Sequence, residues 1–291
     1  MKEGEGRIGT LFLVSTPIGN MEDVTIRALR ILKEVDAVIA EDSRQSKKLL
    51  ERYDVQTPLT KSYYQGAEDR AEELVGRLKS GENLALISDA GTPLISDPGF
   101  KLVRLARREG VPVRPVPGPT AAIAALIASG KPTDSFVFEG MIPRREGPRR
   151  ELLEKLRTER RTAILYESPH RIMDTLKTLQ QVSPDRSVTL CRELTKKYEE
   201  TIEGKPDLVL QKLKEKDAVK GEITLVMEGA SEEEILEEKR EKYAGLSFSE
   251  QFEALQKIQG MERKEAMKRL ARLRGMSKNE VYDKLLEEKE Q

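Results

Sequence analysis

The sequence holds one cysteine, Cys191, and one histidine, His170, among its 291 residues. A single cysteine excludes a disulfide framework, and this pair offers too few ligands for an ordinary zinc site. A Ser-His-Asp triad could draw only on His170, which disfavours that kind of catalysis. We therefore expect no bound metal, and the lone thiol favours a reducing compartment.

Long apolar runs are missing as well. No segment approaches the roughly 20 residues that a membrane helix needs, and residues 1–7 are too polar for a secretory signal. The 51 basic and 51 acidic residues cancel, so the whole chain shows no polyanion-binding signature and any nucleic-acid surface must be a local patch. We expect a soluble, cytoplasmic protein that makes no membrane contact.

The sequence does contain a long loop rich in Gly, Pro and Asp. The segment from Ser88 to Gly99 joins the apolar run 84–87 to a helical pattern over 100–108, and it contains two Asp, two Pro and two Gly. Glycine lets backbone approach a ligand closely, and open α/β sheets bind ligands beyond the carboxyl ends of their strands. The segment therefore favours a ligand-binding loop over a tight turn.

Short apolar runs alternate with helical patterns from Gly9 to Glu228, as in α/β layers. The predicted strands are 11–14, 37–40, 57–63, 84–87, 113–116, 136–139, 163–166, 187–190 and 222–227. The predicted helices are 24–34, one after Arg44, 68–78, 100–108, 121–128, 149–156 and 171–179. Because Pro117–Thr120 interrupts the pattern, we expect two α/β domains, 8–116 and 117–230, with a cleft between them.

The C-terminal part has a different composition. Residues 231–242 are almost wholly charged, so we expect a solvated linker over 231–244. Helices predicted at 249–258, 262–274 and 277–287 form a small all-helical domain, 245–291, that resembles a helix-turn-helix. Between residues 262 and 278 the basic residues far outnumber the acidic ones, which favours RNA contact, while dimerisation or capping stays open. The basic residues are Arg263, Lys264, Lys268, Arg269, Arg272, Arg274 and Lys278, against Glu262 and Glu265.

Six short motifs, in order along the chain, resemble those of the tetrapyrrole methylase superfamily. They are Ser15–Asn20, Ala40–Arg44, Ser88–Pro93, Pro117–Ala121, Tyr166–Arg171 and Arg192–Lys196. The match covers about residues 8–230 and, in the helical tail, most of the remainder. Members that act on tetrapyrroles usually carry more glycine in the first loop, so the sequence is most similar to the branch that methylates ribosomal RNA.

The resemblance implies two α/β domains with S-adenosylmethionine folded in the cleft, and a homodimer. It further implies methylation of the ribose 2′-hydroxyl of a cytidine in the decoding region of 16S rRNA, with the assembled small ribosomal subunit as the expected substrate. By the same resemblance eight residues should contact the cofactor. They are Pro17, Ile18, Asp89, Gly91, Thr92, Thr120, Ala121 and Tyr166.

The residues agree with a sulfonium ligand, which needs carbonyls and a few polar groups rather than a phosphate cradle. Neither a P-loop nor a fingerprint of three spaced glycines is present. The small residues of 120–125 are equally compatible with a packing helix.

Methyl transfer is an in-line displacement, so the enzyme mainly orients the reactants and helps to remove one proton. Glu167 and Lys196 are the predicted proton acceptors. Histidine is the usual base near neutral pH, yet His170 at a helix start could equally be a cap or an RNA contact. Glu193 is better suited to a structural or orienting role.

Arginines are expected to bind the phosphates of the substrate. The candidates are Arg44, Arg144, Arg145, Arg149, Arg171 and Arg192, of which Arg144, Arg145 and Arg149 lie in a predicted basic loop. Arg44, Arg171 and Arg192 could equally form structural ion pairs with Asp42, Glu167 and Glu193.

Two other functions stay open from sequence. A tetrapyrrole methyltransferase would have an apolar substrate cleft and no need for the basic tail. A non-catalytic RNA-binding protein of ribosome assembly would keep only a vestigial cofactor fold, and cofactor binding would separate it from an enzyme.

Overall fold

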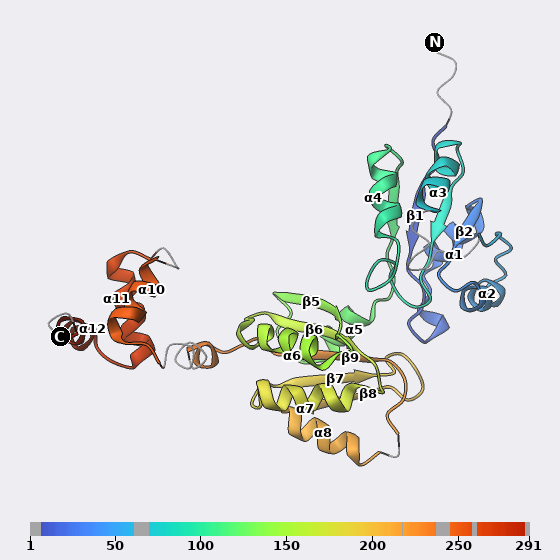
Figure 1. The fold of residues 1–291 in the computed structure, drawn as a ribbon. Coiled ribbons are helices and arrows are strands. Elements are labelled where there is room, and N and C mark those ends of the chain that lie inside the picture. The colour runs from blue at the N-terminus through green and yellow to red at the C-terminus, as the bar shows by residue number, and fades with distance from the viewer. Residues whose placement is uncertain (1–6, 61–69, 217, 237–244, 258–260, 289–291) are drawn as a thin grey trace, which may run out of the picture.

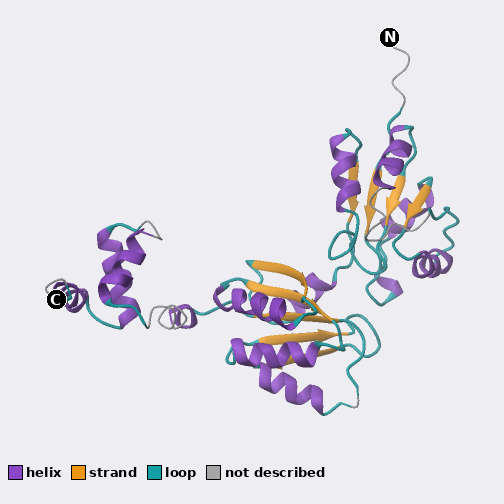
Figure 2. Cartoon of the chain, viewed as in Figure 1, coloured by secondary structure: helices purple, strands orange, loops and turns teal. Residues whose placement is uncertain are grey.

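The computed structural model describes residues 7–60, 70–216, 218–236, 245–257 and 261–288. Two β-sheets, each with its own helices, are followed by a group of helices at the C-terminal end (Figures 1 and 2). Together they confirm the predicted α/β class with a C-terminal helical region.

The first sheet has four parallel strands in the order β2-β3-β1-β4. Helices α3 and α4 pack on one face and α1 and α2 on the other, so β2 and β3 are buried on both sides and read as continuous apolar runs. The edge strand β4 leaves Arg114 and Pro115 exposed. The strands are β1 (Leu11–Val14), β2 (Ala37–Ile39), β3 (Leu84–Leu86) and β4 (Val113–Val116). The helices are the 3₁₀ turn η1 (Met21–Asp23), α1 (Ile26–Glu34), α2 (Ser43–Arg52), α3 (Arg70–Lys79) and α4 (Phe100–Arg108).

The second sheet has five strands in the order β5-β6-β9-β7-β8. Only β5 and β6 pair in parallel, and the other neighbours are antiparallel. Helices α6, α7 and α8 cover one face, while α5 covers the other. The strands are β5 (Phe136–Met141), β6 (Thr162–Glu167), β7 (Val188–Arg192), β8 (Glu200–Gly204) and β9 (Ile223–Met227). The helices are α5 (Ala121–Ala128), α6 (Glu146–Lys155), the 3₁₀ turn η2 (Leu156–Thr158), α7 (Ile172–Val182) and α8 (Pro206–Lys214).

Strand direction brings the sequence motifs to one edge of each sheet. The parallel strands of the first sheet all end at the edge where residues 15–20, 40–44, 88–99 and 117–120 follow. In the second sheet β5, β6 and β7 end at one edge, and β9 begins there because it runs antiparallel to β6 and β7. This edge is where α/β sheets bind ligands.

Most predicted strands and helices lie within two or three residues of the observed ones. Of the strand predicted at 57–63, Leu59 forms a single bridge to Val38, and residues 61–63 lie outside the described part of the chain, as do 68 and 69 of the helix predicted at 68–78. Helix α6 begins three residues before the predicted 149–156, so Arg149 lies inside a helix rather than in a loop.

Strand β8 and helix α8 had no counterpart in the sequence prediction. Strand β8 buries only Ile202, too weak an alternation to detect. Helix α8 carried a usable signal, because Pro206 occupies its first turn and Val209, Leu210 and Leu213 form its buried face.

The C-terminal helices α10 (Phe248–Lys257), α11 (Arg263–Arg274) and α12 (Lys278–Glu287) share an apolar core around Leu270 and Val281. Gly275 ends α11 in the left-handed conformation, with φ 66°, and Ser277 and Glu280 form a reciprocal cap at α12. Of the predicted linker, residues 232–236 are helical and 237–244 lie outside the described residues. Among the described residues, no helix combines the length and apolar character that crossing a bilayer requires.

Candidate functional site

A pocket of about 360 Å³ lies where the loops of the first sheet meet the edge of the second. Residues from both sheets and from the start of α5 line it. They are Ile18, Ala90, Gly91, Thr92, Ile95, Ser96, Asp97, Thr120, Ala121, Met141, Tyr166, Glu167, Ser168, Pro169, Gly221, Glu222, Ile223 and Thr224.

Three motifs interlock to form one side of this pocket. Thr16 and Gly91 exchange backbone hydrogen bonds of 2.8 and 3.1 Å. The Thr92 hydroxyl donates to the Pro119 carbonyl (3.0 Å) and lies 2.9 Å from the Ser15 hydroxyl. Gly91 has φ +81°, and a Cβ there would stand 3.1 Å from Ile18 Cγ2, on the lining of the pocket. The loops therefore hold one another in place without a ligand.

The two sheets also touch through their motifs. The Asn20 amide donates to Thr195 Oγ1 (3.1 Å), and a Cβ on Gly19 would lie 2.4 Å from Lys196 Cγ. Across the pocket, the Tyr166 hydroxyl accepts a hydrogen bond of 3.1 Å from the Ala122 amide, so strand β6 is tied to the start of α5. These contacts bring the first and last motifs together beside the pocket.

Backbone strain concentrates in two of these loops. Leu94, Ser96, Glu193 and Thr195 have φ values of 72°, 66°, 52° and 65°. Residues other than glycine rarely adopt this left-handed conformation, and they do so at sites where the surrounding structure compensates the cost. Ser96 lines the pocket itself.

The charged side chains lining the pocket are all acidic: Asp97, Glu167 and Glu222. Burial raises the pKa of Asp97 to about 6, and the Asp89 carboxylate adds to that rise while a hydrogen bond from Ser88 opposes it. Beside it, burial and the charges of Asp97, Asp89 and Asp42 raise the pKa of Glu41 to about 7. Burial and mutual repulsion make these carboxyl groups harder to ionise, and once ionised they give the region a negative potential. Such a region suits a cationic ligand.

Six of the eight predicted cofactor residues line this pocket: Ile18, Gly91, Thr92, Thr120, Ala121 and Tyr166. Pro17 is buried and is not among the lining residues. The Asp89 carboxylate accepts a hydrogen bond from the Asp42 amide (3.1 Å), so it joins the second motif to the third instead of lining the pocket.

The three predicted catalytic residues have different surroundings. Glu167 lines the pocket, but its carboxylate is bound by Arg171 (2.8 Å), the Thr175 hydroxyl (2.5 Å) and the Ser168 amide (2.6 Å). His170 is exposed and is not among the lining residues.

Lys196 also stands outside the lining. Its ammonium lies 2.9 Å from Glu193 and 3.4 Å from Glu222. Burial opposes its positive charge, but these two carboxylates outweigh burial and raise the pKa of Lys196 above its ordinary value. A lysine held in its protonated form is poorly suited to accept a proton.

The six predicted phosphate-binding arginines divide into two groups. Arg149, Arg171 and Arg192 are bound within the second domain: Arg149 is buried against the Thr178 hydroxyl (3.3 Å), Arg171 pairs with Glu167, and Arg192 pairs with Glu200 (3.0 Å) rather than with Glu193. Arg144 and Arg145 are exposed just before α6. Arg44 is exposed over 88% of its side chain although it pairs with Asp42 (3.0 Å).

Several lining residues were not expected from sequence. Asp97 belongs to the loop 88–99 that first indicated a ligand site, but nothing in its spacing separated it from Asp89. Residues Gly221–Thr224 were missed because they lie at the amino end of β9, and the antiparallel direction of that strand cannot be read from its apolar run.

Comparisons with known proteins agree with this geometry. The family model for Tetrapyrrole (Corrin/Porphyrin) Methylases matches residues 10–209. A Ribosomal RNA small subunit methyltransferase I from Halalkalibacterium halodurans is 49% identical over 77% of each chain. The protein of that name from Bacillus subtilis is 45% identical over 81% of each chain.

Solved structures show the same fold at low sequence identity. A diphthine synthase superposes with a TM-score of 0.59 at 17% identity, covering 75% of this chain and 89% of its own. A uroporphyrin-III C-methyl transferase from Thermus thermophilus, complexed with S-adenyl homocysteine, gives a TM-score of 0.53 at 21% identity, covering 76% of this chain and 97% of its own.

The matches and the cleft between two α/β units define an S-adenosylmethionine-dependent methyltransferase. The chain belongs to the tetrapyrrole methylase family, which confirms the resemblance inferred from the six motifs.

Proposed function

We propose that this methyltransferase acts on the ribose 2′-hydroxyl of a cytidine in the decoding region of 16S rRNA. Its relatives named Ribosomal RNA small subunit methyltransferase I support an rRNA substrate. The observation that carries the chemistry is the pocket between the two sheets, where six predicted cofactor residues converge and every charged lining residue is a carboxylate.

The residues present fit S-adenosylmethionine. The pocket volume falls in the range of small-molecule sites, and Gly91 leaves free a space that a Cβ would fill. Thr92, Thr120 and Tyr166 supply the few polar groups, Ile18 and Ala121 the apolar surface, and the carboxylates complement a positive charge. When bound, the cofactor supplies a methyl group activated by the cationic sulfur.

Asp97 is the proton acceptor in this proposal. Its carboxylate lines the pocket, whereas that of Glu167 is bound by three protein groups and Lys196 is held as a cation. Because burial raises its pKa to about 6, Asp97 is ionised near neutral pH yet more basic than an exposed aspartate. The sequence-based candidates Glu167 and Lys196 then act as positioning residues.

Arg144 and Arg145 are proposed to bind phosphates of the substrate. Both are exposed and lie close in sequence to Met141, which lines the pocket. Arg44 follows the second motif at the start of α2 and extends into solvent. Cations near the pocket would hold the RNA backbone while one ribose enters it.

A tetrapyrrole substrate fits less well. Tetrapyrrole precursors carry several carboxylates, which the Asp97 carboxylate in the pocket would repel. Glu167 and Glu222 add less to this repulsion, because they face Arg171 and Lys196.

The proposal includes a cytoplasmic homodimer that recognises the assembled small subunit. Apolar side chains exposed on α5, Ile123 and Ile127, together with Phe136 on the edge strand β5, support a surface for a second copy.

The test compares substrates for one enzyme preparation. We expect labelled methyl from S-adenosylmethionine to enter small ribosomal subunits that lack the modification. Less label should enter naked 16S rRNA, and a tetrapyrrole precursor should receive none. The phosphodiester bond on the 3′ side of the methylated cytidine should resist alkali, because a methylated 2′-oxygen cannot attack the neighbouring phosphate. Label on the tetrapyrrole alone would contradict the RNA assignment, and cofactor binding without transfer to any of the three would contradict the proposed reaction.

A further inference from the structure

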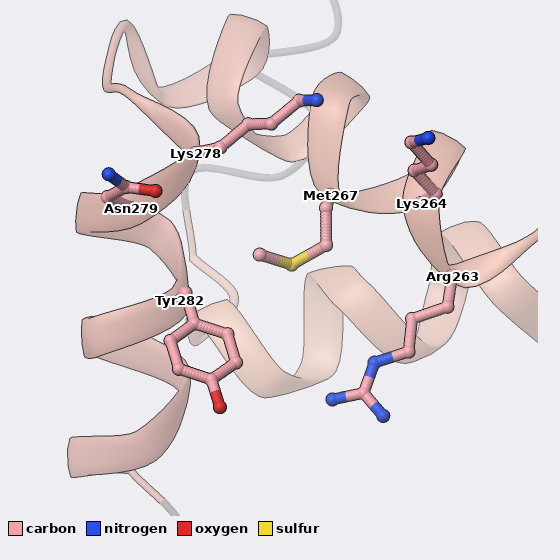
Figure 3. A pocket seen from close by; sticks show the side chains of 6 residues that line it. All are labelled: Arg263, Lys264, Met267, Lys278, Asn279 and Tyr282. Atoms are coloured by element: carbon pink, nitrogen blue, oxygen red, sulfur yellow. The ribbon is translucent and has the colours of Figure 1, made fainter.

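A hollow of about 410 Å³ lies between helices α11 and α12 in the C-terminal helical region. Arg263, Lys264, Met267, Lys278, Asn279 and Tyr282 line it. In Figure 3, Tyr282 and Asn279 on one helix stand opposite Met267 on the other, and the cationic side chains surround the opening. The hollow therefore joins a small apolar surface to a ring of positive charge.

The positive charge continues along α11. A second hollow, of about 610 Å³, shares Lys278 with the first and adds Lys268, Arg269 and Arg272, against one acidic residue, Glu265. Within the described part of the chain, none of the cationic side chains of the two hollows has an ion-pair partner.

Basic residues elsewhere on these helices do have partners. Lys284 pairs with Glu287 (2.6 Å), and Arg274 donates to Gln251 (3.0 Å) and stacks on Phe248. Among the described residues, the cations of the two hollows are thus left available to an anionic ligand.

Tyr282 gives the first hollow a second kind of chemistry. Tyr282 is 49% exposed, whereas the neighbouring Val281 is completely buried. Tyr282 is therefore not part of the helical core. It is one of few aromatic residues in a chain with 4% aromatics and no tryptophan. An exposed ring beside cations is the arrangement with which proteins stack an unpaired nucleobase and bind its flanking phosphates.

We propose that the hollow between α11 and α12 binds an unpaired nucleotide of RNA. The base lies against Tyr282 and Met267, the Asn279 amide offers a donor and an acceptor to its edge, and Arg263, Lys264 and Lys278 bind the adjoining phosphates. The second hollow extends this track along α11. This inference rests on the proposed function for the identity of the RNA, but its test measures binding and not methyl transfer.

The site is built on a rigid frame. Gly275 and the reciprocal cap of Ser277 and Glu280 fix the turn between the two helices, and Leu270 and Val281 pack beneath it. Because Tyr282, Arg263 and Lys278 stand outside that core, their replacement should leave the helices folded.

The experiment measures binding of the full chain to a short fluorescein-labelled single-stranded RNA by anisotropy over a range of salt concentrations. Tyr282→Ala is expected to weaken binding about 5- to 100-fold, because one base loses its stacking surface, whereas Tyr282→Phe should bind like the unaltered protein. The triple variant Arg263→Gln, Lys264→Gln, Lys278→Gln should make the negative slope of log affinity against log salt shallower by about 2. Lys284→Gln removes a paired charge from α12 and should leave the slope unchanged.

Each outcome is decisive when methyl transfer to small subunits is measured in parallel. If the unaltered enzyme transfers methyl but the alanine and triple variants bind RNA normally, the nucleotide site is wrong and the proposed function stands. Equal losses for Tyr282→Ala and Tyr282→Phe would exclude stacking. Binding of ribosomal proteins but not of RNA would replace the RNA site with a protein-docking surface. Absence of methyl transfer by the unaltered enzyme would instead contradict the proposed function.

Discussion

Asp97→Asn is expected to lower the rate of methyl transfer by about 10²- to 10⁴-fold, the usual contribution of a positioned general base. The amide keeps the shape of the side chain and cannot take a proton from the ribose hydroxyl. Single-turnover methyl transfer with saturating cofactor measures this rate directly, and circular dichroism checks that the variant is folded.

The pH profile adds a second signature. In the unaltered enzyme kcat/KM should rise with pH through an apparent pKa between 6 and 7. The pKa of Asp97 is about 6 and that of Glu41 about 7, and the two groups influence each other. Below that range Asp97 is protonated and cannot accept a proton, so the rate falls. In the Asp97→Asn variant, the part of this rise in kcat/KM that comes from ionisation of Asp97 should be absent.

Glu222→Gln is the matched control for Asp97. It removes one carboxylate from the same pocket, but the Glu222 side chain is 68% exposed and already faces Lys196. Its rate should stay within about tenfold of the unaltered enzyme. Equal losses for the two variants would show that Asp97 contributes only negative charge, and a normal rate for Asp97→Asn would remove it from the mechanism.

Glu167→Gln should destabilise the protein by about 3–5 kcal/mol, the cost of breaking a buried ion pair by removing one partner. The Glu167 side chain is fully buried, and the change leaves the Arg171 guanidinium, 2.8 Å away, without its counter-charge. The Thr175 hydroxyl loses a charged acceptor as well. Urea unfolding and the thermal midpoint measure the loss.

A double-mutant cycle separates this structural role from catalysis. Glu167→Gln combined with Arg171→Met should lose less stability than the sum of the single changes, because the uncompensated charge is gone. Methyl transfer by folded Glu167→Gln, below its unfolding transition, should fall far less than that of Asp97→Asn. Unchanged stability with abolished transfer would instead support the catalytic role that the sequence predicted for Glu167.

Much of the pocket lining could be predicted from sequence because loop composition is a local signal. Pro, Gly and Asp residues at the ends of apolar runs marked the edge of the first sheet, and parallel strands carry all such ends to one side. The same logic could not find Gly221–Thr224, because an antiparallel β9 presents its amino end there. Direction within a mixed sheet depends on pairings far apart in the chain.

Side-chain roles were harder to predict for a related reason. From sequence, Arg171 could equally bind phosphate or pair with Glu167. Only the folded turn between β6 and α7 shows that Glu167 binds both Arg171 and Thr175. Similarly, Arg192 finds Glu200 on the neighbouring strand β8, which the sequence did not reveal. A charged residue in a motif indicates a site, whereas its partner decides whether it is free to react.

The pH dependence of cofactor binding tests the central claim most directly, namely that the acidic pocket between the two sheets holds the cationic methyl donor. S-adenosylmethionine and S-adenosylhomocysteine differ in the methyl group and its positive charge, so each serves as the control for the other in calorimetric titrations between pH 8 and pH 5.5. Ionised carboxylates attract the cation, and Glu41 and Asp97 take up protons near their pKa values of about 7 and about 6. As the pH falls through this range, the affinity for S-adenosylmethionine should therefore fall severalfold. The affinity for S-adenosylhomocysteine should change much less. Equal pH dependence for the two ligands, or none for either, would contradict the account.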